Sequence, residues 1–385
     1  TAADDDLVVA ALDPQEPRAV ALQAAGESLV LLKNAGDALP LRKDLKTVAV
    51  IGPNADDGRY SRRHYGPSGG HAITVLEGLR HKLGDAAEVR YAKGVEIAGP
   101  NCPRIEPLPE PLTGEERAGT HEAVRAPTGS DVAVVVLGDG DRTTGESLSR
   151  TSLDLPGRQL ELLQAVQATG TPVVLVLLNG RPMSINWADA HVPAILEAWF
   201  PGDQGGTAIA DALFGDYNPG GKLTVTFPKT AGQIPFNFPS KPNAQSELEK
   251  SRSNGALYTF GHGLSYTKFD YSGLRIAPSK QKADGNVTVS VDVRNAGKRA
   301  GDEIVQLYTR DLVSSVTTYE QNLRGFERIR LAPGERRTVS FILAPVDLAL
   351  LNREMRRVAD PHKFRVMVGG GSQDIRQQAE FEIVQ

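Results

Sequence analysis

Cysteine and long apolar runs are both scarce in this 385-residue chain. Cys102 is the single cysteine, so the chain holds no internal disulfide and no cysteine-rich metal site. We interpret Cys102 as an inert thiol, and it leaves the compartment open because many periplasmic proteins also lack disulfides. No apolar run approaches the roughly 20 residues that a membrane-spanning helix requires, so we expect no membrane partner.

A surplus of positive charge and the common cofactor motifs are missing as well. The formal net charge of -4 provides no broad basic field, which argues against nucleic acid as a partner. The seven histidines are scattered without metal-ligand spacing. Gly138-Asp-Gly140 lacks the third glycine of a dinucleotide-binding fingerprint, and neither Ser28 nor Ser147 lies in a Gly-x-Ser-x-Gly elbow. We therefore expect no metal and no cofactor.

The remaining composition is typical of a globular protein with more than one domain. Hydrophobic residues make up 40% of the chain and charged residues 23%. A chain of 385 residues is too long for one ordinary hydrophobic core, so we expect two or three domains. The first six residues, TAADDD, contain neither an initiator methionine nor a signal peptide, and we expect that another segment precedes them.

Short apolar runs alternate with helical patterns in the first part of the chain. We expect helices over 15–34, starting at 74, starting after 157 and over 206–213. The helix after 157 should have Leu160, Leu163 and Val166 on its apolar face. The apolar runs predict strands at 47–51, 88–92, 131–137, 171–178 and 193–199. This alternation is typical of an α/β domain with a mainly parallel sheet.

The pattern changes near residue 265. From there, runs with alternating apolar and polar residues predict strands at 286–294, 303–308, 337–342 and 363–368. Turns separate them and no helical pattern intervenes, which favours a small β-sandwich. The preceding segment, 228–264, is rich in proline, serine and asparagine, and we expect an extended connector that packs on the α/β domain.

The loop behind the strand at 131–137 carries candidate chemistry. It has the sequence GDGDRTTGESLSR over 138–150. Open α/β sheets bind ligands at the carboxyl ends of their strands, so this loop is well placed for a site. We single out Glu146 as a catalytic carboxylate, against the alternative of an ordinary solvated glutamate.

Three aspartates near Glu146 have structural interpretations. Asp139 and Asp141 could be imagined as an in-chain nucleophile, but turn capping is the commoner role at the end of a strand. Asp154 precedes Leu-Pro, and we expect it to cap the following helix and to pair with Arg150.

A second loop is rich in arginine, tyrosine and glycine. It has the sequence DGRYSRRHYGPSGG over 57–70 and follows the strand at 47–51, so it should emerge at the same edge of the sheet. Sugar sites combine aromatic rings, which cover apolar sugar faces, with planar donors for hydroxyl groups. Arg63 and Tyr65 suit those roles as substrate-binding residues, and the alternative is a simple surface loop.

Six ordered motifs extend along essentially the whole chain. They are ESLVLLKN at 27–34, VAVIGP at 48–53, SRTSLDLP at 149–156, AWFPG at 198–202, FGDYNPGGKL at 214–223 and GALYTFGHGLSY at 255–266. Together they resemble glycoside hydrolase family 3, and most closely its bacterial β-glucosidase branch.

The resemblance implies an (α/β)6 sandwich followed by a fibronectin type III-like β-sandwich. It divides the chain into a linker helix at 1–27 behind a missing N-terminal (β/α)8 barrel, the sandwich domain at 28–227, a connector at 228–265 and the fibronectin-like domain at 266–385. In this family the active site lies between the sandwich and the barrel, and the barrel supplies an aspartate nucleophile in a Ser-Asp-Trp-like motif. This sequence has no such tripeptide.

By its place before SRTSLDLP, Glu146 matches the family's general acid/base. A retaining glycosidase needs a second carboxyl about 5–5.5 Å away. We therefore expect the C-terminal part of an exo-acting retaining β-glucosidase that cleaves β-glucosides or oligosaccharides. The resemblance implies a barrel chain or segment as its partner and a periplasmic or secreted location, and it leaves a homodimer open. The alternatives are a β-xylosidase of the same family and a non-catalytic carbohydrate-binding or scaffolding module.

Overall fold

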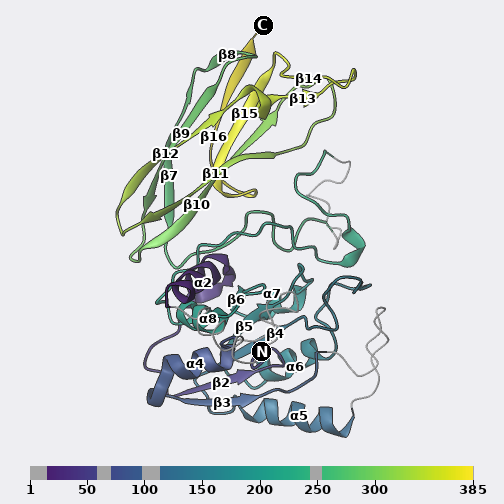
Figure 1. Cartoon of the computed structure of the whole chain (residues 1–385), viewed down its shortest axis with the longest axis vertical. Helices are drawn as coiled ribbons and strands as arrows, with labels where there is room; N and C mark the ends of the chain where they lie inside the picture. The colour runs from purple at the N-terminus through teal and green to yellow at the C-terminus, as the bar shows by residue number, and fades with distance from the viewer. Residues whose placement is uncertain (1–14, 59–70, 98–112, 243–253, 385) are drawn as a thin grey trace, which may run out of the picture. The chain divides into compact units, whose positions relative to one another are not determined.

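The computed structural model describes residues 15–58, 71–97, 113–242 and 254–384. The chain divides into two compact units, Thr1–Gly221 and Lys222–Gln385. Figure 1 labels the elements of both units. The first unit contains α2 (Gln15–Ser28), β1 (Val30–Asn34), β2 (Thr47–Ile51), α4 (Val75–Leu83), β3 (Glu88–Ala92), α5 (Gly114–Arg125), β4 (Val132–Gly138), α6 (Gln159–Gln167), β5 (Val173–Leu178), α7 (Asn186–His191), β6 (Ala194–Glu197) and α8 (Gly205–Leu213).

The first unit is built on one six-stranded sheet with the strand order β1-β6-β5-β4-β2-β3. The neighbours from β6 to β3 are parallel, and only β1 runs antiparallel to β6. Every residue of β4 and of β5 is buried, as expected for central strands that are covered on both faces. The prediction of a mainly parallel sheet is thus confirmed.

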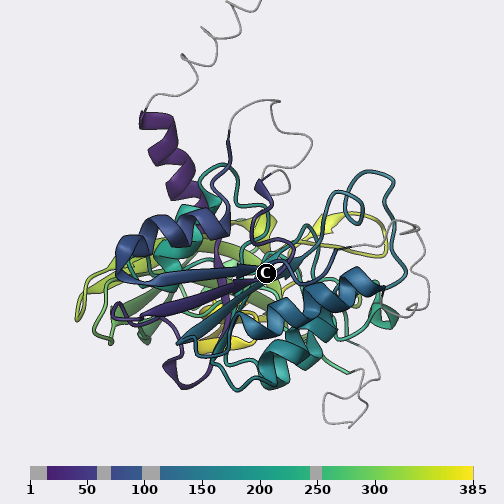
Figure 2. The ribbon, with the colours of Figure 1, turned by 90° about the horizontal axis from the view of Figure 1, so that it is seen from below.

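Helices cover both faces of this sheet. Helix α8 packs against α4 and α2, whereas α5 packs against α6. Figure 2 shows α2 and α4 on one side of the strands and α5 and α6 on the other. Helices α4 and α8 approach closely through two glycines, because a Cβ atom on Gly78 would overlap the carbonyl oxygen of Gly206. The sheet therefore lies between two helical layers.

Two local predictions in this unit are wrong. The helix expected over 15–34 ends at Ser28, and Val30–Asn34 forms the edge strand β1, because pairing with β6 overrides the local helical pattern. The second wrong prediction concerns the apolar face of α6, where Leu160 was expected with Leu163 and Val166. Leu160 is 36% exposed, and Leu162 is fully buried beside Leu163 and Val166 in its place.

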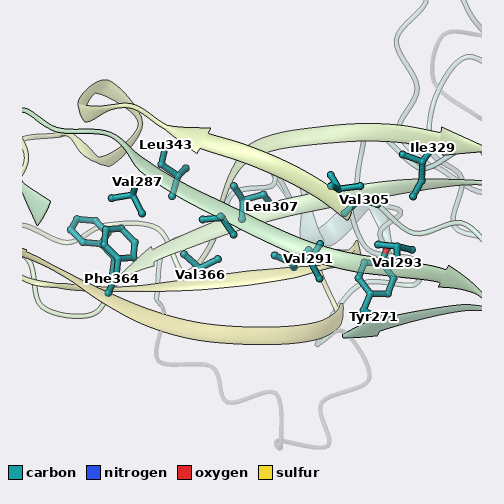
Figure 3. Close-up of a cluster of buried hydrophobic side chains, with 14 of the residues drawn as sticks. Tyr271, Val287, Val291, Val293, Val305, Leu307, Ile329, Leu343, Phe364 and Val366 are labelled. Atoms are coloured by element: carbon teal, nitrogen blue, oxygen red, sulfur yellow. The ribbon is translucent and has the colours of Figure 1, made fainter. Parts of the chain in front are cut away.

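The second unit is a β-sandwich. Its strands form sheets with the orders β11-β10-β15-β16-β8 and β12-β9-β7. Alternate residues of β9 are buried, and Figure 3 shows Val287, Val291 and Val293 facing Val305 and Leu307 of β10 across the core. The elements are β7 (Phe269–Ala277), β8 (Lys280–Lys282), β9 (Val287–Asn295), β10 (Gly301–Asp311), β11 (Asn322–Leu331), β12 (Arg336–Leu343), α9 (Pro345–Leu348), β13 (Leu350–Leu351), β14 (Arg357–Val358), β15 (Lys363–Gly371) and β16 (Asp374–Val384).

The four strands predicted for this part are present as β9, β10, β12 and β15. The connector expected to pack on the α/β domain belongs to the second unit. Its Phe238 stacks on Phe260 with ring centroids 4.4 Å apart and meets Tyr308 of β10 edge-on. The finer division of the chain at residues 27, 227 and 265 stays a proposal.

Candidate active site

Polar side chains collect where the parallel strands of the first unit end. Asn54 follows β2, Asp139 follows β4, Asn179 follows β5 and Glu197 ends β6, and each is at most 1% exposed. Asn54 donates from Nδ2 to the backbone carbonyl of Asp139 over 2.8 Å. Since the strands are parallel and adjacent, their carboxyl ends bring these residues to one edge of the sheet.

Asp139 anchors the start of the loop that contains Glu146. Its Oδ1 atom accepts hydrogen bonds from Thr143 Oγ1 and from Arg150 Nη1, each over 3.0 Å. The backbone amide of Gly140 donates to Thr143 Oγ1 over 2.9 Å and completes the turn. The side chain of Asp139 therefore links the first turn of the loop to Arg150 at its end, and turn capping by Asp139 stays a prediction. Because its carboxylate is fully buried and paired with Arg150, substrate does not reach it, which argues against Asp139 as a nucleophile.

A second arginine reaches Asp139 from the neighbouring strand. Arg181 follows β5, and its Nε atom lies 3.7 Å from Asp139 Oδ2. Asn179 donates from Nδ2 to the backbone carbonyl of Arg181 over 2.8 Å, which fixes the backbone of this short turn. The sequence analysis missed Arg181, because the run at 171–178 was interpreted only as a strand and the residues after it were not considered. Its place behind a strand that neighbours β4 was the signal that could have found it.

Glu146 lies on an exposed turn of the same loop. The backbone amide of Leu148 donates to the carbonyl of Gly145 over 3.1 Å and closes a four-residue turn with Glu146 at its second position. Ser147 at the third position has φ +60°, as type II turns require. For a residue other than glycine this conformation costs about 1–2 kcal/mol, so the surrounding contacts must maintain the turn.

Glu197 is a buried acid that the sequence analysis also missed. Burial raises the pKa of Glu197 well above its ordinary value of 4.5, and the nearby charge of Asp139 raises it further. The backbone amide of Trp199 donates to Oε1 over 2.9 Å, and it opposes the shift together with a hydrogen bond from Asn179. Burial therefore favours the protonated form of Glu197, which lies close enough to Asp139 to feel its charge.

The remaining candidates have different outcomes. Arg63, Tyr65 and Cys102 lie outside the described residues. The prediction for Asp154 is wrong, because α6 has Arg158 at its N-cap and no side-chain cap. Asp154 instead accepts from Ser152 Oγ over 2.7 Å, and Arg150 Nη2 donates to its backbone carbonyl over 2.6 Å. The helix starts too far along the chain for Asp154 to cap it.

Across 15–58, 71–97, 113–242 and 254–384, no group of three or more His, Cys, Asp or Glu side chains could hold a metal ion. Across the same ranges, no helix has the length and apolar character that crossing a bilayer demands.

Comparison with family models places these residues in a known context. Residues 29–266 match the model of the glycosyl hydrolase family 3 C-terminal domain, which covers more than half of the chain. The chain belongs to glycosyl hydrolase family 3. Residues 303–372 match a fibronectin type III-like domain, so the family and the two folds expected from the sequence are confirmed.

Two curated relatives match nearly all of this chain. A periplasmic β-glucosidase from Salmonella typhimurium is 40% identical over 95% of the chain and 50% of the relative. A β-xylosidase from Formosa agariphila is also 40% identical, over 93% of the chain and 49% of the relative. The chain therefore spans about half the length of the curated relatives it matches.

Solved structures of the family agree in fold. A β-glucosidase from Erythrobacter marinus superposes with a TM-score of 0.86 at 36% identity, over 96% of this chain and 51% of that one. A β-glucosidase from Listeria innocua in complex with glucose has a TM-score of 0.82 at 31% identity, over 97% of this chain and 50% of that one. Both likenesses extend through the α/β unit and the β-sandwich.

Proposed function

We propose that this chain is the acid/base part of a retaining, exo-acting β-glucosidase, and that a barrel in another segment or chain supplies the aspartate nucleophile. Glu146 is the proposed acid/base. The observation that carries the proposal is its position on an exposed turn behind the carboxyl end of β4, where sheets of this kind bind ligands. Membership in family 3 and the β-glucosidase names of its relatives support the same reaction class.

The proposed chemistry has two steps. The barrel aspartate attacks the anomeric carbon of the terminal glucosyl residue while the Glu146 carboxylic acid donates its proton to the glycosidic oxygen, so the C–O bond breaks and the aglycone leaves. The Glu146 carboxylate then takes a proton from water, and the resulting hydroxide attacks the anomeric carbon. Glucose and the free aspartate are released, and Glu146 is again protonated.

An azide experiment tests Glu146 in the full-length enzyme. Azide attacks the glycosyl-enzyme without a general base, so it should restore turnover of an activated aryl glucoside by Glu146→Ala and yield glucosyl azide. Hydrolysis of cellobiose should fall about 10²–10⁴-fold, the usual contribution of general acid/base catalysis. Glu122→Ala, which removes an exposed carboxylate from α5, serves as the control and should behave like the wild type. Normal cellobiose hydrolysis by Glu146→Ala would contradict the proposal.

Arg63 and Tyr65 are the proposed substrate-binding residues. An arginine fork orients sugar hydroxyls and a tyrosine ring covers an apolar sugar face. Arg63→Ala and Tyr65→Ala should raise KM for a glucoside more than they lower kcat, because they contact the substrate in its ground state too. If both variants keep the wild-type KM, this assignment is wrong.

The sugar specificity has a second candidate. The β-xylosidase relative is as similar to this chain as the β-glucosidase relative, at 40% identity each. We propose glucose as the sugar, since the structural relatives named above are β-glucosidases. The ratio of kcat/KM for nitrophenyl β-glucoside and nitrophenyl β-xyloside decides between them, and a ratio below one would favour the xylosidase.

A non-catalytic sugar-binding module is the alternative from another class. It is favoured by a hollow of about 400 Å³ in the β-sandwich unit, which Arg310, Asp311 and Tyr319 help to line. Calorimetry of the chain with cellobiose tests it. Binding that Tyr319→Ala abolishes and Glu146→Ala leaves unchanged would favour the module.

The location and the assembly state are part of the proposal. The periplasmic relative from Salmonella typhimurium supports a periplasmic or secreted location. Cell fractionation of the producing organism measures it, and activity confined to the cytosol would contradict it. The homodimer stays a proposal. Sedimentation equilibrium tests it, because the molar mass of the native protein should be twice that of one subunit.

A further inference from the structure

One side-chain nitrogen contacts residues on both sides of Glu146. Arg181 Nη2 donates to the backbone carbonyl of Thr143 over 3.0 Å and to Thr144 Oγ1 over 3.3 Å, just before the turn. The same atom lies 3.4 Å from the carbonyl oxygen of Leu148, the last residue of the turn. Arg181 therefore spans the segment that contains Glu146.

The arginine is itself held in place. Its Nε atom faces Asp139 Oδ2 over 3.7 Å, and its side chain is only 21% exposed. Asn179 donates to its backbone carbonyl, and the preceding residue, Gly180, has no room for a side chain. A Cβ atom on Gly180 would lie 2.6 Å from the Phe200 ring and 2.8 Å from Thr144 Cγ2. The turn behind β5 thus packs directly against the Glu146 loop.

We propose that Arg181 is a positioning residue for Glu146, an inference that rests on the proposed acid/base role. A planar guanidinium offers several donors in a fixed fork, whereas a lysine ammonium is a point charge on a flexible stem. Arg181 Nη2 faces the acceptors on Thr143, Thr144 and Leu148, while its Nε faces the carboxylate of Asp139. The single nitrogen of a lysine cannot occupy both positions. General acid catalysis depends on such positioning, because a displacement of about 1 Å can cost roughly 10²-fold in rate.

Leaving-group dependence in the full-length enzyme tests this role. A dinitrophenyl glucoside departs without protonation, whereas cellobiose needs the acid. For Arg181→Gln, kcat/KM on cellobiose should fall about 10- to 100-fold, while kcat/KM on the dinitrophenyl glucoside should stay within about threefold. Arg181→Lys should show the same pattern. Azide should accelerate turnover of the activated substrate, which is also the result expected for Glu146→Ala.

Hydrogen exchange on the 385-residue chain provides a readout that needs no catalysis. The amides of Thr144 and Leu148 are hydrogen-bonded to Gly140 and Gly145. In Arg181→Gln these amides should exchange on the order of tenfold faster. Arg158→Gln is the matched control, because Arg158 is 19% exposed and pairs with Glu161 on α6. It should leave both exchange and leaving-group dependence unchanged.

The outcomes separate this inference from the proposed function. Suppose that Glu146→Ala loses kcat/KM on cellobiose but keeps it on the dinitrophenyl glucoside. If Arg181→Gln then lowers kcat/KM equally on both substrates, or on neither, the positioning role is wrong. If Glu146→Ala lacks this difference between the two substrates, the acid/base proposal fails. Hydrogen exchange then remains as the measurement that shows whether Arg181 holds the turn. Unchanged exchange at Thr144 and Leu148 would overturn the inference in either case.

Discussion

Arg150 and Asp139 form an ion pair across the base of the loop that carries Glu146. Arg150 Nη1 lies 3.0 Å from Asp139 Oδ1, and the two side chains are only 4% and 0% exposed. Arg150 Nη2 also donates to the carbonyl of Asp154 over 2.6 Å. Since the pair joins residues 139 and 150, it closes the loop at its two ends, and water does not screen it.

Removing the arginine of this pair should be costly. Arg150→Met leaves the Asp139 carboxylate buried without its closest cation, and breaking a buried pair in this way costs about 3–5 kcal/mol. Urea unfolding should show that loss in the free energy of unfolding of the α/β unit. Arg158→Met, which breaks a more exposed pair with Glu161, should cost less than about 1 kcal/mol.

The double variant Arg150→Met/Asp139→Asn checks the mechanism. It removes both charges, so its cost should be smaller than the sum of the two single costs. Additive costs would show that the two charges do not interact, and the ion-pair account would then fail.

Glu197 makes stability depend on pH. Burial raises its pKa well above 4.5 in the folded state, so the native state binds more protons than the unfolded state between those two values. The contribution of Glu197 is therefore fully present below pH 4.5 and is lost as pH rises through the folded pKa. Within that window the slope approaches about 1.4 kcal/mol per pH unit.

Glu197→Gln isolates that slope, because glutamine has nearly the same shape and does not ionise. The variant should gain stability relative to the wild type as pH rises above 4.5, measured by thermal unfolding in a series of buffers. Glu122→Gln on α5, an exposed glutamate, controls for the loss of one surface carboxyl. Parallel stability profiles for the wild type and Glu197→Gln would rule out the titration of Glu197 in this range.

The glycine contact between α4 and α8 predicts a steric effect. Gly78→Ala places a methyl group against the backbone of Gly206, which cannot yield without moving the helix. We expect a loss of about 1–3 kcal/mol, the range for overpacking. Gly114→Ala at the start of α5 meets nothing within 4 Å, and it should be neutral or stabilising by up to about 1 kcal/mol. Equal melting temperatures for the two variants would contradict the close approach.

Asn295 predicts an effect in the β-sandwich. Its side chain is fully buried, accepts from Thr267 Oγ1 over 2.6 Å and donates to the carbonyl of Leu331 over 3.0 Å. Asn295→Leu leaves these buried groups unsatisfied, at a cost of about 1–3 kcal/mol for each group. Thr267→Val removes only one donor and should cost less. Urea unfolding of the β-sandwich unit measures both, and a cost for Asn295→Leu no larger than that of Thr267→Val would be inconsistent with a shared network.

Local pattern predicted the central elements of the fold well. Strands β4 and β5 are continuous apolar runs, and such runs are typical of parallel strands that are buried on both faces. Val30–Asn34 was mistaken for helix because the residues of an edge strand next to a helix carry no distinct period. Its conformation depends on pairing with β6, which lies far along the chain.

The candidate site also contains one residue that local sequence predicts and two that depend on the tertiary structure. Glu146 is identified by its motif, which is a local property of the sequence, and its catalytic role stays a prediction. No local sequence motif identifies Arg181 or Glu197 as part of the site. Their roles depend on which strands are neighbours and on the depth at which each side chain is buried, and neither quantity is local.

For this protein, sequence alone determined the alternation of strands and helices, the change to β-sandwich patterning and the family to which the chain belongs. Tertiary structure decided the strand order, which brings the end of β4 next to the end of β5. It thereby placed Arg150 and Arg181 around Asp139. The physical reason is that burial excludes water, so charges distant in the chain interact strongly only once the sheet has assembled them.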